Sequence, residues 1–221
     1  MKLLINALIK FIFAILLVGV LLFLPAGTLN YNGGLRFFIL LFLPILLLGI
    51  ILFIKAPDLL KKRLYSREEE KAQKWVVAAS GIIFILGFIS AGVDFRFSLT
   101  SVPKFVMILA SILFLFSYGI YAEVMRENSY LSRTVQVEEN QRVIDTGLYG
   151  IVRHPMYLAT VLMFLMIPLI LGSWISFVIF LAYPLIIVFR INNEENVLSE
   201  QLIGYIEYKN KVKYKLVPFI W

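Results

Sequence analysis

The only histidine of the chain stands in a short polar and aromatic run, GLYGIVRHPMY, which covers Gly147 to Tyr157. The segment from Pro155 to Phe189 carries no charged residue, and charge returns at Arg190, Glu194 and Glu195. Imidazole, guanidinium and carboxylate groups bind ligands, hold charged groups in place and move protons. If the uncharged segment folds back on itself, the two polar clusters meet, so we expect a functional site there.

The composition places these clusters in a membrane protein. Apolar residues make up 61% of the chain, and the mean hydropathy is +0.88. Several apolar runs are as long as the ~20 residues that cross a bilayer. Helices satisfy their backbone hydrogen bonds within one segment, and the strict alternation of barrel strands is absent from the sequence. We therefore predict an all-α integral membrane helical bundle.

Six apolar runs are candidates for membrane-spanning helices. They cover Leu3–Leu24, Phe37–Ile54, Trp75–Val93, Phe105–Ala122, Met156–Gly172 and Trp174–Phe189. Gly172 and Ser173 alone connect the last two, which predicts a tight antiparallel hairpin. Proline has no N–H group, so we expect bends at Pro44, Pro168 and Pro184, whereas Pro103 is expected to begin its helix.

Lysine and arginine are retained on the cytoplasmic side of membrane proteins, so their distribution predicts the topology. Residues 55–74 contain seven of them, residues 126–153 four, and residues 190–215 five. The alternate loops hold only Arg36, Arg96 and Lys104. We predict an integral protein of the cell (inner) membrane with both termini in the cytoplasm. A cleaved signal peptide is the alternative for the first run, although that run is long for one.

Charge and cysteine content argue against several other classes of protein. The net charge of +7 follows from membrane orientation, and no soluble basic domain is present, so we expect no nucleic-acid partner. Because the chain has no cysteine and a single histidine, we expect no metal site. The lack of cysteine also excludes disulfides and thiolate nucleophiles, and it says nothing about the redox compartment.

Three segments on the predicted cytoplasmic side are long enough to form structure. Residues 56–74 mix basic and acidic side chains at helical spacing, which is typical of an interfacial helix on anionic lipid. Residues 126–147 include a β-like stretch at Thr134–Val137 and a turn at Asp145–Gly147. A C-terminal amphipathic helix is predicted because apolar and aromatic residues recur every three or four positions from Leu198 to Val212. Gly204 is expected to kink it.

The ordered set GLYGIVRHPMY, RINNEENVL and GYIEYKNKVKYKLVPFIW resembles the isoprenylcysteine carboxyl methyltransferase family and its prokaryotic relatives. The likeness extends upstream to PDLLKKRL, AGVDFRF and NSYLS, so it covers residues 57–221. We accordingly divide the chain into an N-terminal helix pair, 1–56, and a methyltransferase-like membrane core, 57–221. The wider superfamily includes phospholipid N-methyltransferases, small-thiol methyltransferases and membrane sterol reductases.

The resemblance implies a cytoplasm-facing pocket for S-adenosylmethionine. The residues that it implies as cofactor contacts are Gly147, Tyr149, Val152, Arg153, His154, Pro155, Tyr157, Glu194 and Glu195. Their chemistry suits this cofactor: tyrosine rings stack on adenine, carboxylates accept from hydroxyl or ammonium groups, and arginine and histidine donate. Pro155 is suited to begin a helix, whose free N–H groups favour a carboxylate.

Arg190 is the catalytic candidate by the same resemblance. A carboxylate acceptor is already ionised and needs no base, and a guanidinium positions it through two parallel hydrogen bonds. An amine or thiol acceptor would have to lose a proton, and Glu123 or Glu195 would then be the candidate base. We predict that Glu123 and Asn128 contact this substrate.

Each of these residues also has an ordinary structural interpretation. Arg190 and Glu194 are four residues apart, as in a surface ion pair of a helix. Glu123 could instead extend to the interface and pair with Arg126. The tyrosines of the C-terminal helix, Tyr205 and Tyr208, are interpreted as packing residues.

Three functional hypotheses from different classes follow. The first is an S-adenosylmethionine-dependent methyltransferase with a lipophilic or membrane-borne acceptor, such as the prenylated cysteine carboxylate that names the family. Within it, a phospholipid N-methyltransferase and a thiol S-methyltransferase are alternatives, because Met156 departs from the serine common in eukaryotic members. The second is an NADPH-dependent membrane reductase. The third is a non-enzymatic membrane transporter or assembly factor.

Overall fold

The computed structural model describes residues 2–64, 71–131, 137 and 140–221, and in these parts of the chain the regular elements are all helical. The α-helices are α1 (Lys2–Ala26), α2 (Asn32–Lys55), α3 (Pro57–Leu64), α4 (Lys71–Phe97), α5 (Lys104–Glu127), α6 (Pro155–Leu171), α7 (Trp174–Phe180), α8 (Ala182–Gln201) and α9 (Tyr205–Lys211). A 3₁₀ turn, η1 (Gly147–Gly150), precedes α6. The predicted fold class is confirmed.

The predicted spans correspond to helices of the structure. Four of them, α1, α2, α4 and α5, are long and apolar enough to cross a membrane, and so is the run of α7 and α8. The shorter α6 is also apolar. The last helix does not end at Phe189, because α8 continues to Gln201 and carries Arg190 and the glutamate pair with it.

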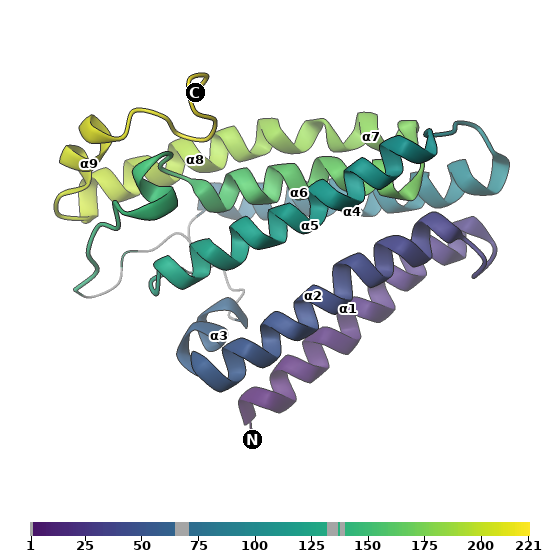
Figure 1. Cartoon of the computed structure of the whole chain (residues 1–221), viewed down its shortest axis with the longest axis horizontal. Coiled ribbons are helices and arrows are strands. Elements are labelled where there is room, and N and C mark those ends of the chain that lie inside the picture. The colour runs from purple at the N-terminus through teal and green to yellow at the C-terminus, as the bar shows by residue number, and fades with distance from the viewer. Residues whose placement is uncertain (1, 65–70, 132–136, 138–139) are drawn as a thin grey trace.

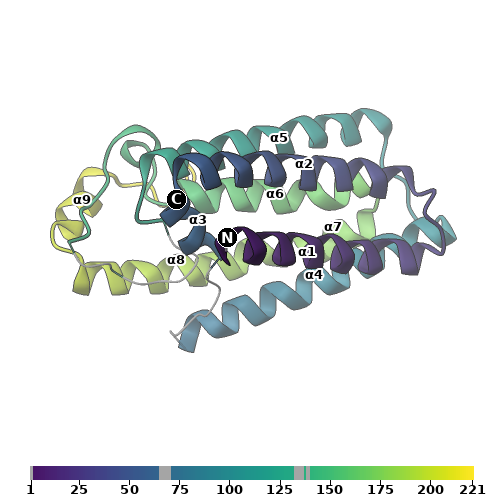
Figure 2. The same ribbon diagram turned by 90° about the horizontal axis from the view of Figure 1, so that it is seen from below.

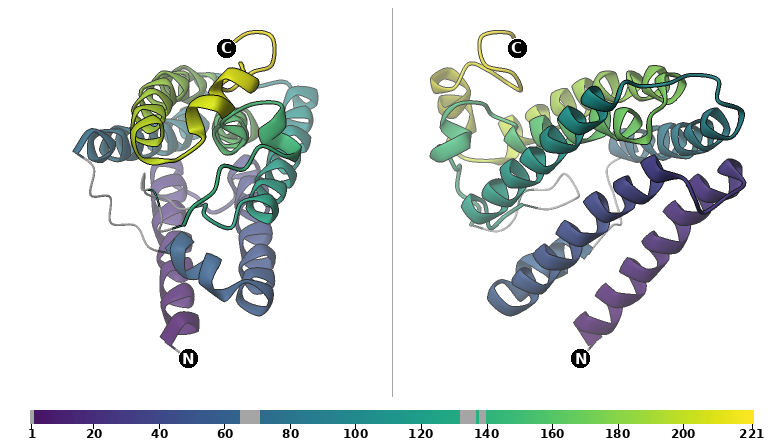
Figure 3. Two further views of the ribbon diagram at one scale, coloured as in Figure 1. Left: turned by 90° about the vertical axis from the view of Figure 1, so that its left-hand side faces the viewer. Right: turned by 45° about the vertical axis from the view of Figure 1, so that its right-hand side comes forward.

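The helices α4 to α8 form a bundle, and the α1–α2 hairpin leans against it at an angle (Figure 1). The hairpin is closest to the bundle at the loop between α1 and α2 and diverges from it towards the N-terminus, as Figure 3 also shows. Burial follows this geometry, because the buried residues of α1 are Leu22 and Ala26, at its C-terminal end. Seen from below, α1 lies along α4 and α2 crosses in front of α6 (Figure 2).

Aromatic side chains fill much of the core of the bundle. Phe84 makes edge-to-face contacts with Phe164 and Phe180, at ring distances of 4.6 and 5.6 Å. Gly87 is required where α4 meets α7, since a Cβ there would lie 2.3 Å from the Phe180 ring. This packing holds α4, α6 and α7 together below the site.

The end of the bundle that is remote from the polar clusters contains the predicted hairpin turn. Gly172 adopts a left-handed conformation with φ +85°, and Ser173 caps α7 by accepting from the Ser176 amide at 3.0 Å. Asp94, which is 1% exposed, accepts hydrogen bonds from the Ser173 hydroxyl and the Thr100 amide. The hairpin therefore returns α8 alongside α6, as predicted.

Two proline effects place the ends of helices. Pro184 separates α7 from α8, because its ring excludes a helical bond to the Phe180 carbonyl, and α7 ends at Phe180. Pro103 is the residue that immediately precedes α5, which confirms its predicted position at a helix start. α2 and α6 continue through Pro44 and Pro168.

The polar segments are only partly helical. The continuous C-terminal amphipathic helix is wrong, because α8 ends at Gln201 and α9 begins after Gly204, which has φ +85°. Gly204, where a kink was predicted, therefore lies at a break between two helices. The predicted apolar face does pack together, with Leu202, Tyr205, Tyr208 and Val212 forming one cluster against Val137 and Val143. Of the interfacial helix, α3 is described, whereas residues 65–70 and most of the β-like stretch lie outside the described residues.

Candidate functional site

The two polar clusters meet where α6 begins and α8 ends. His154 is the N-cap residue of α6 and Pro155 its first residue, as predicted from the sequence. The backbone N–H groups of Arg153 and His154 donate to the carbonyls of Tyr214 and Lys215, each at 2.9 Å. The segment that follows α9 therefore fixes the chain just before α6.

Glu195 is the centre of a buried polar network. Its Oε1 accepts from Arg153 Nε at 2.6 Å and lies 3.2 Å from His154 Nε2. Arg153 also donates to the carbonyls of Val212 and Lys213, at 2.6 and 2.9 Å. The side chains of Arg153, His154 and Glu195 are at most 5% exposed. Because buried charges need paired partners, this network locks α6, α8 and the C-terminal segment to one another.

Arg190, Tyr157 and Glu194 form a second chain of contacts. The Tyr157 hydroxyl accepts from Arg190 Nε at 2.8 Å and donates to Glu194 Oε2. Arg190 is buried, with 9% of its surface exposed, so the interpretation as an ordinary surface ion pair with Glu194 is wrong. A tyrosine on α6 instead lies between two charged residues of α8 and fixes the plane of the guanidinium.

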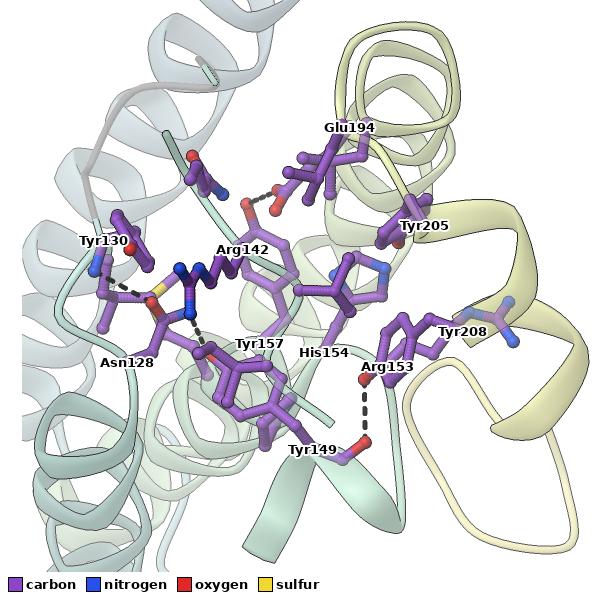
Figure 4. Close-up of a pocket in the computed structure, with 18 of the residues that line it drawn as sticks. Asn128, Tyr130, Arg142, Tyr149, Arg153, His154, Tyr157, Glu194, Tyr205 and Tyr208 are labelled. Atoms are coloured by element: carbon purple, nitrogen blue, oxygen red, sulfur yellow. Dashed lines mark hydrogen bonds between the residues drawn. The ribbon is translucent and has the colours of Figure 1, made fainter. Parts of the chain in front are cut away.

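A cavity lies between these two networks and the residues that precede α6 (Figure 4). Its empty volume, including the part open to solvent, is about 840 Å³. Eight of the predicted site residues line it: Asn128, Tyr149, Arg153, His154, Pro155, Tyr157, Arg190 and Glu194. The sequence pattern therefore located the cavity.

Four predicted residues do not line the cavity. Glu195 lies behind it and holds Arg153 and His154. Val152 is 3% exposed and belongs to the packing. Gly147 has φ +50° and lies against the carboxylate of Glu127, which accepts from the Leu148 amide at 3.1 Å. Glu123 pairs with Arg126 at 2.6 Å on an exposed face.

Other lining residues were not predicted. Tyr205 and Tyr208 are buried in the cavity wall, although the sequence suggested packing alone. The remaining ones come from the ends of α5, α6 and α8 and from the segment before η1: Tyr130, Leu131, Gln141, Arg142, Val143, Ile144, Met156, Leu198 and Leu202. For Leu198, Leu202, Tyr205 and Tyr208, the signal in the sequence is the periodic apolar face from Leu198 to Val212.

The tyrosine hydroxyls differ in their partners. Tyr149 accepts from Asn128 Nδ2 at 2.9 Å, and Tyr208 donates to the Tyr149 carbonyl at 2.8 Å. Tyr205 is 4% exposed, and its hydroxyl has no hydrogen-bond partner within the described parts of the chain. Burial raises the pKa of Tyr149 to about 12, and burial together with the carboxylates of Glu195 and Glu194 raises the pKa of Tyr205. Both hydroxyls therefore keep their protons at neutral pH.

Apolar side chains, tyrosine rings and a few charged groups surround the cavity together, which suits an amphiphilic or nucleoside-like ligand. Residues 2–64, 71–131, 137 and 140–221 contain no cluster of three or more histidine, aspartate or glutamate side chains that could hold a metal ion.

Residues 105–202 match the family model described as phospholipid methyltransferase. This range runs from α5 to the end of α8 and includes Asn128, Arg153, His154, Arg190 and Glu195. None of the curated proteins matches the chain. Over these residues, which are less than half of the chain, the protein is similar to phospholipid methyltransferases.

Proposed function

We propose that the protein is an S-adenosylmethionine-dependent methyltransferase that methylates a lipophilic or membrane-borne acceptor. The observation that carries this proposal is the cavity, in which Arg153, His154, Tyr157, Arg190 and Glu194 come together at one end of a membrane helical bundle. The match to the methyltransferase family over the elements that build this cavity supports the same conclusion.

The residues of the cavity fit the proposed cofactor. The buried hydroxyl of Tyr205 is a donor without a protein partner in the described residues, and a ligand that accepts its hydrogen bond would satisfy it. Tyr149, Tyr157 and Tyr208 offer rings for stacking, and Glu194 is a carboxylate for hydroxyl or ammonium groups. When bound, S-adenosylmethionine would supply an electrophilic methyl group on a sulfonium.

The protein's own contribution is to hold the side chains that line the cavity in fixed orientations. Glu195 fixes the orientation of Arg153 and His154 from behind the cavity, so we assign it a positioning role rather than direct contact with the cofactor. Tyr157 holds Arg190 through Nε. A guanidinium held in this way orients an anionic acceptor by parallel hydrogen bonds, which supports the role of Arg190 in aligning a carboxylate for transfer.

A phospholipid amine is the second candidate acceptor, because the family model that matches residues 105–202 is that of phospholipid methyltransferases. An amine has to lose its proton before or during transfer. Neither base considered from the sequence lines the cavity, since Glu123 pairs with Arg126 and Glu195 pairs with Arg153 and His154. For this acceptor the base would be Glu194, whose carboxylate lines the cavity.

We further propose that the cavity faces the cytoplasm at the inner membrane. It lies at the end of the bundle where α4 and α6 begin and α5 and α8 end (Figure 1). The described parts of the basic segments 55–74, 126–153 and 190–215 lie at this same end, and the positive-inside rule predicts that it faces the cytoplasm.

Calorimetry on the detergent-purified chain with S-adenosylhomocysteine, and separately with NADPH, tests the proposed function. We expect binding of S-adenosylhomocysteine, with a loss of affinity in His154→Ala and Glu195→Ala. Glu123→Ala is the matched control, because this carboxylate is outside the cavity, and its affinity should equal that of the wild type. Binding of NADPH alone would establish the reductase instead, and binding of neither would favour a non-enzymatic role.

A further inference from the structure

Among the described residues, three arginines line the cavity, and two of them are connected to carboxylates. Arg153 is paired with Glu195 at 2.6 Å. Arg190 donates to Tyr157, whose hydroxyl in turn donates to Glu194, so one tyrosine connects this cation to a carboxylate. The third, Arg142, lines the same cavity from the segment before η1.

Arg142 makes no hydrogen bond and no ion pair with any residue in the described parts of the chain. Its side chain extends over the cavity between Tyr157 and Asn128 in Figure 4. Two described carboxylates, from the end of α5 and from the segment before η1, have other partners. Asp145 binds Lys211 at 2.6 Å, and the carboxylate of Glu127 accepts from the Leu148 amide.

The charge balance of the cavity follows from these contacts. Among the described residues, the lining contains the carboxylate of Glu194 and the three arginines, and Glu195, which lies behind the cavity, pairs with Arg153. Within the described parts of the chain, Arg142 is the lining arginine that has no hydrogen bond and no ion pair. Cationic residues of α3 add to the field on this side, because Lys62 Nζ lies 5.9 Å above the ring of Tyr130, another lining residue.

A guanidinium that lines a cavity and has no counter-ion in the described residues is suited to bind carboxylate or phosphate oxygens. We propose that Arg142 binds an anionic group, a carboxylate or a phosphate, of a ligand held in this cavity. This inference rests on the proposed function, because that function names the two ligands that would carry the anionic group. The group is either the amino acid carboxylate of the methyl donor or the anionic group of a lipid acceptor.

Two pairs of probes distinguish these sources. S-Adenosylhomocysteine carries a carboxylate, and 5′-methylthioadenosine is the same nucleoside thioether without the amino acid end. Oleoyl lysophosphatidic acid carries a phosphate, and monoolein has the same acyl chain without charge. Dissociation constants are measured by calorimetry in detergent for the wild type, Arg142→Ala and Arg142→Lys. Arg126→Ala is the matched control, since Arg126 pairs with Glu123 on an exposed face outside the cavity.

We expect Arg142→Ala to weaken binding of one anionic probe by about tenfold or more, the size of one hydrogen bond between charged groups. The uncharged probe of that pair should change less than about twofold, and Arg142→Lys should recover part of the affinity. If Arg142→Ala loses affinity for S-adenosylhomocysteine, the anionic group belongs to the methyl donor. If it loses affinity for lysophosphatidic acid, the group belongs to a lipid.

The inference is overturned if neither anionic probe loses affinity relative to Arg126→Ala, or if the uncharged probes lose as much as the charged ones. If the wild type binds S-adenosylhomocysteine and Arg142→Ala binds both anionic probes with unchanged affinity, Arg142 does not bind the anion. The proposed function then still stands. A wild type that binds lysophosphatidic acid through Arg142 and fails to bind S-adenosylhomocysteine rejects the proposed function and leaves the anion site standing.

Discussion

Tyr205 and Tyr208 are three residues apart on α9, and both are buried in the wall of the cavity. The Tyr208 hydroxyl has a partner in the protein, the Tyr149 carbonyl at 2.8 Å. The Tyr205 hydroxyl has none in the described residues. Removing a hydroxyl that is already bonded costs fold stability, whereas removing one that lacks a partner does not. The two side chains therefore form a matched pair for separating binding from folding.

Tyr205→Phe should leave the midpoint of thermal unfolding in detergent unchanged or slightly raised. It should weaken the affinity for S-adenosylhomocysteine by about fivefold, or roughly 1 kcal/mol. Tyr208→Phe should instead lose about 1 kcal/mol of stability, because the Tyr149 carbonyl is left without its donor. Calorimetry and thermal melts on both variants check this. Equal effects of the two substitutions on affinity would show that the Tyr205 hydroxyl does not bind the ligand.

Glu195 is expected to act on the cavity through its neighbours. Glu195→Ala leaves the buried guanidinium of Arg153 without its carboxylate, and breaking such a pair costs about 3–5 kcal/mol of folding free energy. Glu195→Gln keeps the shape and one acceptor, so the loss should be smaller. Glu194 is only half-buried, and Glu194→Ala should lower the melting temperature much less. If Glu194→Ala lowered the melting temperature as much as Glu195→Ala or more, the positioning role of Glu195 would be contradicted.

At the scale of elements, the turn at η1 connects the end of α5 to the start of α6. Gly147 has φ +50°, a conformation that favours glycine, and a Cβ there would lie 1.5 Å from the Glu127 carboxylate. Glu127 is the last residue of α5 and accepts from the Leu148 amide. This close approach presses the turn against α5 and places Tyr149 in the cavity.

Gly147→Ala should therefore destabilise the fold by more than about 1 kcal/mol, from the strained φ and the displaced carboxylate together. Gly119→Ala, on α5, is the control, because its Cβ would meet nothing within 4 Å and alanine favours a helix. Thermal melts of both variants decide this. A Gly147→Ala variant as stable as Gly119→Ala would show that the turn tolerates a side chain.

The elements that could be predicted from the sequence are those determined by local pattern. The length of the apolar runs predicted the spanning helices. The two-residue turn at Gly172 and Ser173 predicted the hairpin that brings Arg190 and His154 to the same end of the bundle. These signals depend on residues close together in the chain. The meeting of the two polar clusters followed from them directly.

The parts of the site that could not be predicted depend on contacts between distant segments. The helical face from Leu198 to Val212 was visible, but its turn into the cavity at Gly204 depends on packing against Val137 and Val143. Spacing placed Arg190 and Glu194 on one face, and the tyrosine between them comes from α6. Arg142 had no local signal, since an arginine in a polar segment looks like any solvated cation.

At the scale of the whole molecule, the division into residues 1–56 and 57–221 stays a prediction. The diverging α1–α2 hairpin is compatible with it (Figure 3). Lys10 of α1 nevertheless donates to the carbonyl of Leu64, the last residue of α3. α3 in turn is held near the cavity, because Lys62 donates to the Ser129 carbonyl at 3.3 Å. The N-terminal pair thus touches the core through α3 as well as through α4.

The predicted topology is testable because the chain has no cysteine. Asn30→Cys lies in the exposed loop between α1 and α2, and Glu207→Cys lies on the exposed face of α9. In intact cells, a membrane-impermeant maleimide should label the first and not the second, and in inside-out vesicles the pattern should reverse. Labelling of Glu207→Cys in intact cells would place the cavity outside the cytoplasm.

The most direct test of the account is methyl transfer in native membranes that have been washed free of soluble protein. Purified protein is added with S-adenosylmethionine that carries a labelled methyl group, and label in the membrane pellet is counted. Wild type and Arg126→Ala should transfer label equally, and Arg190→Lys, which keeps the charge but loses the planar fork, should be slower by roughly 100-fold. No label above background with the wild type, or equal label with Arg190→Lys, would contradict the claim that this cavity performs methyl transfer to a membrane-borne acceptor.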